Sequence, residues 1–171
     1  MSSMRDANLV GALAVAIGDA VTRAAEAAAP EPGPAAAALM LVAHLPGMSI
    51  DALRIGVGLS HPGAVRLVDR LAARGMIERR ASAEDGRRVA LHLTGAGENA
   101  ATAIAEGRHK AVAKALDRLP AAERAAFIAA TEKMLAALVA GPEDALRVCR
   151  LCDEAVCTRC PVDICLGIGG D

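Results

Sequence analysis

The chain has 171 residues, 54% of them hydrophobic, and a formal net charge of −1 at pH 7. Phe127 is its one aromatic residue, and alanine supplies much of the apolar fraction, which favours helix. This length excludes two large domains. We see no apolar run of the roughly 18 to 20 residues that a membrane span needs, and no signal-type pattern at the N-terminus, so we expect a cytoplasmic protein.

The charges are distributed unevenly along the chain. Residues 50–93 hold eight arginines against five acidic residues, whereas the remainder holds eleven basic and fifteen acidic residues. A basic segment in a nearly neutral chain is typical of a surface that faces phosphates. Residues 50–93 are therefore the candidate nucleic-acid-binding segment.

Four helices are expected in the first half of the chain. Apolar residues recur every four positions from Leu9 to Val21, which predicts a helix over residues 7–29, and a second helix follows a short proline-rich linker at residues 34–44. Ser49 and Ser60 can cap two more helices, which extend to Val57 and to Arg74. Gly75 can end the last of these in a left-handed conformation.

A hairpin and three more helices are expected after Gly75. Residues 76–80 and 89–93 have the composition of two short strands around a polar turn. Thr94 can cap a long helix to about residue 119, Pro120 opens another to about residue 140, and a short helical piece follows Gly141-Pro142. The predicted fold class is mainly α with a small β wing.

This order of elements predicts a winged helix-turn-helix with a helical dimerisation region. The DNA-binding lobe would span about residues 34–93 within a domain of residues 1–141. The first helix and the helices over residues 94–140 carry more apolar surface than so small a lobe can cover, so we expect them to form the interface of a homodimer. Residues 142–171 would form a separate cysteine-rich segment.

Several motifs resemble those of the MarR family of transcriptional regulators, and they occur in that family's order. They are Val65-Arg66-Leu67-Val68-Asp69-Arg70-Leu71, Arg74-Gly75-Met76-Ile77-Glu78-Arg79, Asp85-Gly86-Arg87-Arg88 and Leu93-Thr94-Gly95-Ala96-Gly97. The resemblance covers about residues 7–140. It implies a regulator, not an enzyme, that binds double-stranded DNA through a recognition helix over residues 60–74.

The same resemblance implies the DNA-contacting residues. In the recognition helix the candidates are Ser60, His61, Gly63, Ala64 and Arg66, and in the wing they are Arg87 and Arg88. Asp85 matches the family's acidic residue that steadies the wing arginine. Val65 departs from the family, because a hydroxyl residue usually stands there, and sequence readout by this helix is expected to differ accordingly.

The resemblance also implies a small-molecule effector, and here the chain departs from the pattern again. Many family members bind phenolic ligands in pockets lined by aromatic side chains, whereas Phe127 is the single aromatic residue here. An aromatic effector is therefore less expected here than in other family members. The sequence leaves open whether any small-molecule effector exists.

Some basic residues have simpler interpretations. Four further arginines are as compatible with a solvent-exposed face as with DNA contact, namely Arg70, Arg74, Arg79 and Arg80. His61 is as compatible with an exposed capping turn as with a DNA contact. The remaining histidines, at positions 44, 92 and 109, are isolated in the sequence, which favours structural or solvent-exposed roles over metal ligation.

All five cysteines lie between Cys149 and Cys165. Such clustering in a reducing compartment indicates metal or redox chemistry instead of disulfides. The expected metal ligands are Cys149, Cys152, Cys157 and Cys160, with Cys165 a possible alternative ligand. Arg147, Arg150 and Arg159 can offset the charge of four thiolates.

The spacing of the cysteines favours an iron–sulfur cluster over zinc. Cys152, Cys157 and Cys160 reproduce the C-x4-C-x2-C run of plant-type ferredoxins, and Cys160 precedes a proline. Only four residues separate the two C-x-x-C pairs, whereas zinc sites of the ribbon or finger type usually need a dozen or more. The cluster would be of the 2Fe–2S or 4Fe–4S type, with zinc or a metal-free thiol switch as alternatives.

Together these features predict a homodimeric regulator that binds a pseudo-palindromic operator and senses redox or metal state. The cysteine segment would act through the preceding dimerisation helices. Alternatives are the same regulator with a structural zinc site, or a small redox or electron-transfer protein. The chain shows no glycine-rich nucleotide loop after a strand and no serine–histidine–aspartate grouping, which weighs against the last alternative.

Overall fold

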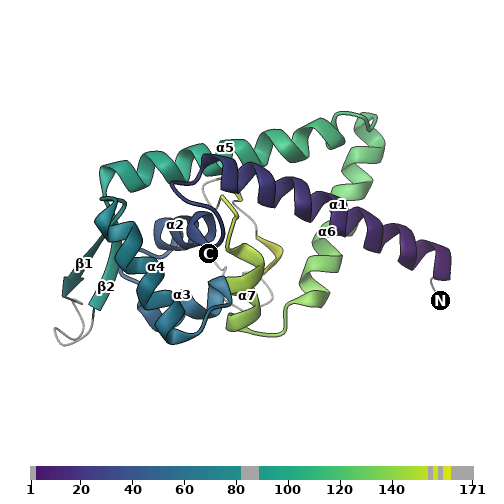
Figure 1. Cartoon of the computed structure of the whole chain (residues 1–171). Helices are drawn as coiled ribbons and strands as arrows, with labels where there is room; N and C mark the ends of the chain where they lie inside the picture. The colour runs from purple at the N-terminus through teal and green to yellow at the C-terminus, as the bar shows by residue number, and fades with distance from the viewer. Residues whose placement is uncertain (1–2, 82–88, 154–155, 158–159, 163–171) are drawn as a thin grey trace.

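The structure, a computed structural model, describes residues 3–81, 89–153, 156–157 and 160–162 (Figure 1). It is mainly helical with one small sheet, as the sequence predicts. The elements in chain order are α1 (Met4–Ala28), α2 (Ala35–His44), α3 (Ile50–Val57), α4 (His61–Ala73), β1 (Ile77–Ala81), β2 (Val89–Leu93), α5 (Gly95–Leu116), α6 (Ala121–Leu138) and α7 (Pro142–Cys149).

Hydroxyl caps begin three of the helices at the predicted places. The backbone nitrogen three residues ahead donates to Ser49 Oγ at 3.1 Å, to Ser60 Oγ at 3.3 Å and to Thr94 Oγ1 at 3.1 Å. Each bond satisfies a donor that has no partner inside its helix. Gly75, at φ +68°, turns the chain out of α4 and into the hairpin, which confirms its predicted left-handed conformation.

Helix α2 lies at the centre of the fold (Figure 1) and is buried along most of its length. Every residue from Ala35 to Val42 is buried, and the run of four alanines lets neighbouring helices approach closely. Leucines from α3, α4 and β2, with Ile104 of α5, complete the core around it. Apolar burial of this kind supplies the main stabilisation of the lobe.

The two strands pair antiparallel, with Ile77 opposite Leu93 and Ala81 opposite Val89. The turn after α2 extends this sheet, because Gly47 N donates to Leu91 O at 2.8 Å and Leu91 N donates to Met48 O at 3.0 Å. The base of the wing is thereby fixed to the helical core.

Helix α1 packs along α5 (Figure 1), and their backbones come close where Gly107 faces Ala24. By length and composition alone, α1 could cross a membrane, with a mean hydropathy of 1.2 in its most apolar window. Average composition over a window is a weaker criterion than an unbroken apolar run of that length, which the sequence lacks. Alanines raise the average around Asp19 and Arg23 without forming an unbroken apolar run.

Helix α6 buries none of its residues within the chain. Ile128, Met134 and Leu138 are all exposed on it, and α1 likewise exposes Leu9 and Leu13 among its apolar side chains. Exposed apolar side chains on two long helices form a surface that a single chain leaves uncovered.

Candidate nucleic-acid interface and cysteine segment

The exposed side of α4 begins at its N-terminal cap. Ser60, His61 and Arg66 are exposed, and Gly63 is half-buried with its backbone nitrogen bound to the Ser60 hydroxyl. Ala64 differs from the sequence expectation, because its side chain is fully buried against the core. A buried methyl group cannot face a DNA groove, so Ala64 serves packing.

Arg66 differs from the other arginines of the basic segment. Its guanidinium makes no ion pair with any residue in the described part of the chain, whereas Arg70 Nε lies 2.9 Å from Glu31 Oε1 and Arg79 Nη2 lies 2.6 Å from Asp69 Oδ1. Arg74 and Arg80 are also engaged, with Glu31 and Glu78 respectively. Within the described residues, Arg66 is thus the arginine of α4 whose charge is not already matched by an acidic side chain.

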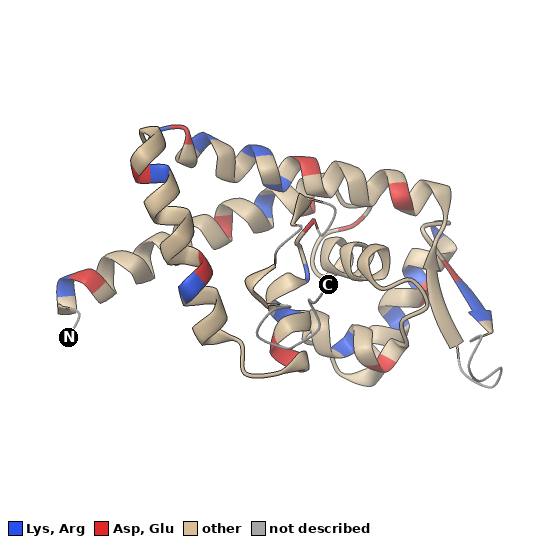
Figure 2. Ribbon diagram, turned by 180° about the vertical axis from the view of Figure 1, so that it is seen from behind, with Lys and Arg blue, Asp and Glu red and all other residues tan. Residues whose placement is uncertain are grey.

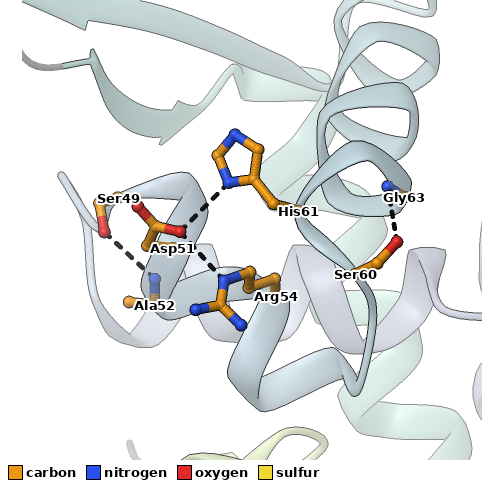
Figure 3. A network of polar contacts seen from close by, with 7 residues as sticks. All are labelled: Ser49, Asp51, Ala52, Arg54, Ser60, His61 and Gly63. Carbon is orange, nitrogen blue, oxygen red and sulfur yellow. Dashed lines mark hydrogen bonds and ion pairs between the residues drawn. The ribbon is translucent and has the colours of Figure 1, made fainter.

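Asp51 joins the two helices of the helix-turn-helix (Figure 3). Its Oδ1 atom accepts hydrogen bonds from Arg54 Nε at 3.0 Å and from His61 Nδ1 at 3.1 Å. The bond from Arg54 and then the bond from His61 lower the pKa of the Asp51 carboxyl below its ordinary value. Sequence reasoning missed this contact because the aspartate and the histidine lie on different helices.

The wing lies beside this surface, and basic residues mark both the hairpin and the neighbouring helices (Figure 2). The ion pair between Arg79 of β1 and Asp69 of α4 ties the hairpin to the recognition helix. Asp85, Arg87 and Arg88 lie outside the described residues, so their expected roles stay predictions.

The cysteine segment turns immediately after α7. Cys152 N donates to Cys149 O at 2.8 Å, which closes a tight turn around the first C-x-x-C pair. Cys149, Cys152 and Cys160 are half-buried and Cys157 is exposed, while Cys165 lies outside the described residues. Among the residues that the structure describes, no group of three His, Cys, Asp or Glu side chains is placed to hold a metal ion.

Helices α5 and α2 hold this turn. Arg108 Nη2 of α5 lies 3.8 Å from Cys152 Sγ, and His44, the last residue of α2, is hydrogen-bonded through Nε2 to the Cys152 carbonyl. The neighbouring Asp153 carboxylate lies 4.0 Å from His109 Nε2. The first half of the cysteine segment is therefore fastened to α2 and α5.

Helix α7 packs against α3 of the DNA-binding lobe. A side chain at Gly56 would lie 3.5 Å from the Leu146 carbonyl oxygen and would overlap Leu41, so the two helices meet at a glycine. The described part of residues 142–171 thus contacts both the lobe and α5, a proximity that its position in the sequence did not indicate.

A cavity of about 670 Å³ opens between α2, β2 and α5. His44, His92 and His109 all line it, together with Asp153 from the cysteine segment. These histidines lie far apart in the sequence, which favoured separate structural or solvent-exposed roles. The fold brings them to one cavity.

Comparison with protein families gives a match over residues 32–88 to a model described as MarR family. The match includes α2 to β1, extends through residues 82–88 and ends before the cysteines. A curated protein of Thauera aromatica, named as a proposed transcriptional regulatory protein for the hcr operon, is 30% identical over 96 residues. That alignment covers 56% of this chain and 58% of the relative, so the chain spans little more than half the relative's length.

Solved structures share the fold. The YusO protein of Bacillus subtilis superposes with a TM-score of 0.61 at 23% identity, covering 77% of this chain and 94% of that one. RV1404 of Mycobacterium tuberculosis gives a TM-score of 0.64 at 21% identity, covering 79% and 94%. At these identities the similarity establishes the winged-helix architecture.

Proposed function

We propose that the chain is a member of the MarR family of winged-helix proteins, a cytoplasmic transcriptional regulator that binds a pseudo-palindromic operator as a homodimer. The single observation that carries the proposal is the exposed side of α4. It presents His61 and an Arg66 guanidinium that is unmatched within the described residues, next to a basic wing. A helix of this kind enters the major groove while the wing reaches the neighbouring minor groove.

Homodimerisation follows from the uncovered apolar surface of α1 and α6. Because α6 has no fully buried residue within the chain, a partner surface would supply packing that the single chain does not give it. A second copy with two-fold symmetry supplies a self-complementary one. Two recognition helices about 34 Å apart would then read two half-sites of an operator with approximate dyad symmetry.

Binding to DNA from the region upstream of the chain's own gene tests this function. We expect the wild-type dimer to bind a dyad-symmetric site there and to bind unrelated DNA far more weakly at the same salt concentration. Arg66→Ala and Arg87→Ala should each weaken binding, whereas Arg118→Ala, in the connection between α5 and α6, serves as the matched control. Indistinguishable affinity for all DNA sequences would contradict a regulator that recognises an operator.

We further propose that the cysteine segment is a redox-responsive or metal-responsive site, with an iron–sulfur cluster as the favoured occupant. Four cysteines at positions 149, 152, 157 and 160 suit such a cluster, and zinc is the alternative. A backbone hydrogen bond from Cys152 N to Cys149 O keeps the first C-x-x-C pair within one turn of the chain. A guanidinium beside Cys152 Sγ can compensate the charge of a thiolate ligand.

Metal analysis and a visible absorption spectrum of protein purified without air distinguish the alternatives. Iron with acid-labile sulfide and visible absorbance supports the cluster, and stoichiometric zinc without colour supports a zinc site. Metal-free protein that reversibly forms a disulfide supports a thiol switch. Electron transfer without operator binding would favour the small redox protein.

A further inference from the structure

We propose that Asp51 is a positioning residue for DNA readout: its carboxylate holds the His61 imidazole so that Nε2 faces the major groove as a hydrogen-bond acceptor. This inference rests on the proposed DNA-binding function and deepens it. It assigns a role to an acidic residue in a segment where basic residues would be the expected DNA contacts.

The geometry begins with the Asp51–His61 contact. Asp51 lies in the first turn of α3 and His61 in the first turn of α4, and their Oδ1 and Nδ1 atoms are 3.1 Å apart (Figure 3). Both side chains remain open to solvent, at 64% and 55% exposure. The contact therefore lies on the outer surface of the helix-turn-helix, where DNA would dock.

The carboxylate is itself held in place. Arg54, one turn along α3, donates from Nε to the same Oδ1 atom at 3.0 Å. Bonds from Arg54 and His61 lower the pKa of Asp51, a carboxyl that is ionised at neutral pH even at its ordinary pKa. The Ser49 cap fixes the turn that carries Asp51. Asp51 is thus a fixed acceptor before DNA arrives, which reduces the ordering cost of docking.

A carboxylate can only accept, so Nδ1 of His61 carries the hydrogen. In the neutral imidazole this leaves Nε2 without a hydrogen, as an acceptor. Nε2 has no hydrogen-bond partner among the described residues and lies on the side of the ring away from Asp51 (Figure 3). The pair therefore presents one acceptor atom outward in a defined orientation.

An acceptor in the major groove matches the exocyclic amino groups, which are N4 of cytosine and N6 of adenine. Guanine and thymine present acceptors at the corresponding edge and would be disfavoured. We expect this single hydrogen bond to discriminate by about 2- to 12-fold at one base pair in each half-site. Removing Asp51 would leave the imidazole free to rotate and to change tautomer, and that discrimination would fall.

The tautomer can be measured without DNA. Full-length protein labelled with nitrogen-15 in histidine is examined by long-range proton–nitrogen correlation at a pH where the imidazole is neutral, with His61 assigned from the His61→Gln spectrum. We expect an unprotonated Nε2 in the wild type and a shift toward protonated Nε2 in Asp51→Ala. A wild-type His61 protonated at Nε2 would overturn the proposal.

Operator binding supplies the second test, as a double-mutant cycle with Asp51→Ala, His61→Ala and the double variant. Each is measured against the operator and against operators changed at single base pairs. We expect Asp51→Ala to lose discrimination at one base pair and to have no further effect once His61 is alanine. Loss of a carboxylate that only repelled phosphates would instead strengthen binding to every sequence, in both backgrounds, and would overturn the proposal.

Glu106→Ala is the matched charge control, because Glu106 is an exposed carboxylate paired with Lys110 on α5, away from α3 and α4. Its base preference should equal that of the wild type. Thermal unfolding and dimer size are measured for every variant, and the tautomer result stands independently of DNA affinity. If the wild type recognises no operator, the proposed function fails; if it does and the cycle is additive, the role of Asp51 alone fails.

Discussion

Glu31 Oε1, in the linker between α1 and α2, accepts a 2.9 Å hydrogen bond from Arg70 Nε near the end of the recognition helix. Arg74 reinforces the contact, since its Nη1 donates to the Pro30 carbonyl at 2.9 Å. The Glu31 side chain is only 9% exposed. Helix α4 is therefore tied to the linker that leaves α1.

Replacing Glu31 by alanine should destabilise the fold by about 1 to 2 kcal/mol, because it leaves two arginines without their nearly buried partner. The measurement is chemical denaturation of the wild type and the variant. Asp117→Ala is the control, since Asp117 is 70% exposed and lies 3.4 Å from Arg124, and exposed pairs contribute little. Equal stability of the two variants would contradict a structural role for the Glu31 contact.

Short sequence patterns predict where several helices begin, but they do not predict which helices contact one another. Ser49, Ser60 and Thr94 act as caps within three residues of sequence, so their patterns predict their hydrogen bonds. By contrast, Glu31 and Arg70 are 39 residues apart, and His44 and Cys152 are 108 apart. Such pairs arise from the packing of helices, which no local pattern specifies.

The candidate site shows the same division. The exposure of His61 and Arg66 follows from the amphipathic pattern of α4, and their expected place on the outer face agrees with the structure. Ala64 was misplaced because the family motif marks a stretch of helix and not each side chain's direction, and α4 turns that methyl into the core. The roles of these residues in DNA contact stay predictions.

Arg66→Ala should weaken operator binding by several-fold or more and reduce the slope of log affinity against log salt by about 0.9 if the contact is to phosphate. The physical reason is that Arg66 has no ion pair among the described residues and can neutralise DNA without first breaking one. Titrations by fluorescence anisotropy at several salt concentrations measure both quantities. An unchanged affinity and slope would exclude Arg66 from the interface.

Gly97→Ala should destabilise the protein by about 1 to 3 kcal/mol. Gly97 lies where α5 crosses the start of the hairpin, and a methyl group there would overlap the Met76 carbonyl oxygen. Gly95→Ala is the control in the same helical turn, because nothing lies within 4 Å of its added methyl group. Gly95→Ala should be neutral or slightly stabilising through helix propensity. Thermal unfolding of the two variants tests this close approach, and equal midpoints would contradict it.

Met134→Glu on α6 should shift the protein from dimer toward monomer at micromolar concentration, because it places a charge on an apolar surface that only a partner can cover. Glutamate keeps a high helix propensity, so α6 itself should persist. Leu45→Glu is the control, with 44% exposure in the wild type against 47% for Met134. Light scattering after size-exclusion chromatography gives the mass, and a wild-type monomer or an unaffected Met134→Glu dimer would refute this interface.

Cys152→Ser should remove the bound cofactor and change operator affinity, whereas Cys165→Ser should retain both. Cys152 is the candidate ligand that connects the cysteine segment to the helices. Its sulfur lies near Arg108 of α5, and its carbonyl is hydrogen-bonded to His44 of α2. Loss or oxidation of a cluster would release this turn from its fixed geometry.

The same change can reach the DNA-binding lobe through α7, which packs on α3. A coupling of about 1 to 3 kcal/mol would change operator affinity by roughly 5- to 150-fold. The measurement compares operator binding by loaded, oxidised and metal-free wild type with binding by each variant, at constant salt and with the dimer verified. Serine variants at Cys149, Cys157 and Cys160 should behave as Cys152→Ser does. A sensor must bind the operator with different affinity when its cysteine segment changes state. Equal operator affinity of the loaded, oxidised and metal-free protein would therefore mean that the cysteine segment is only a structural element.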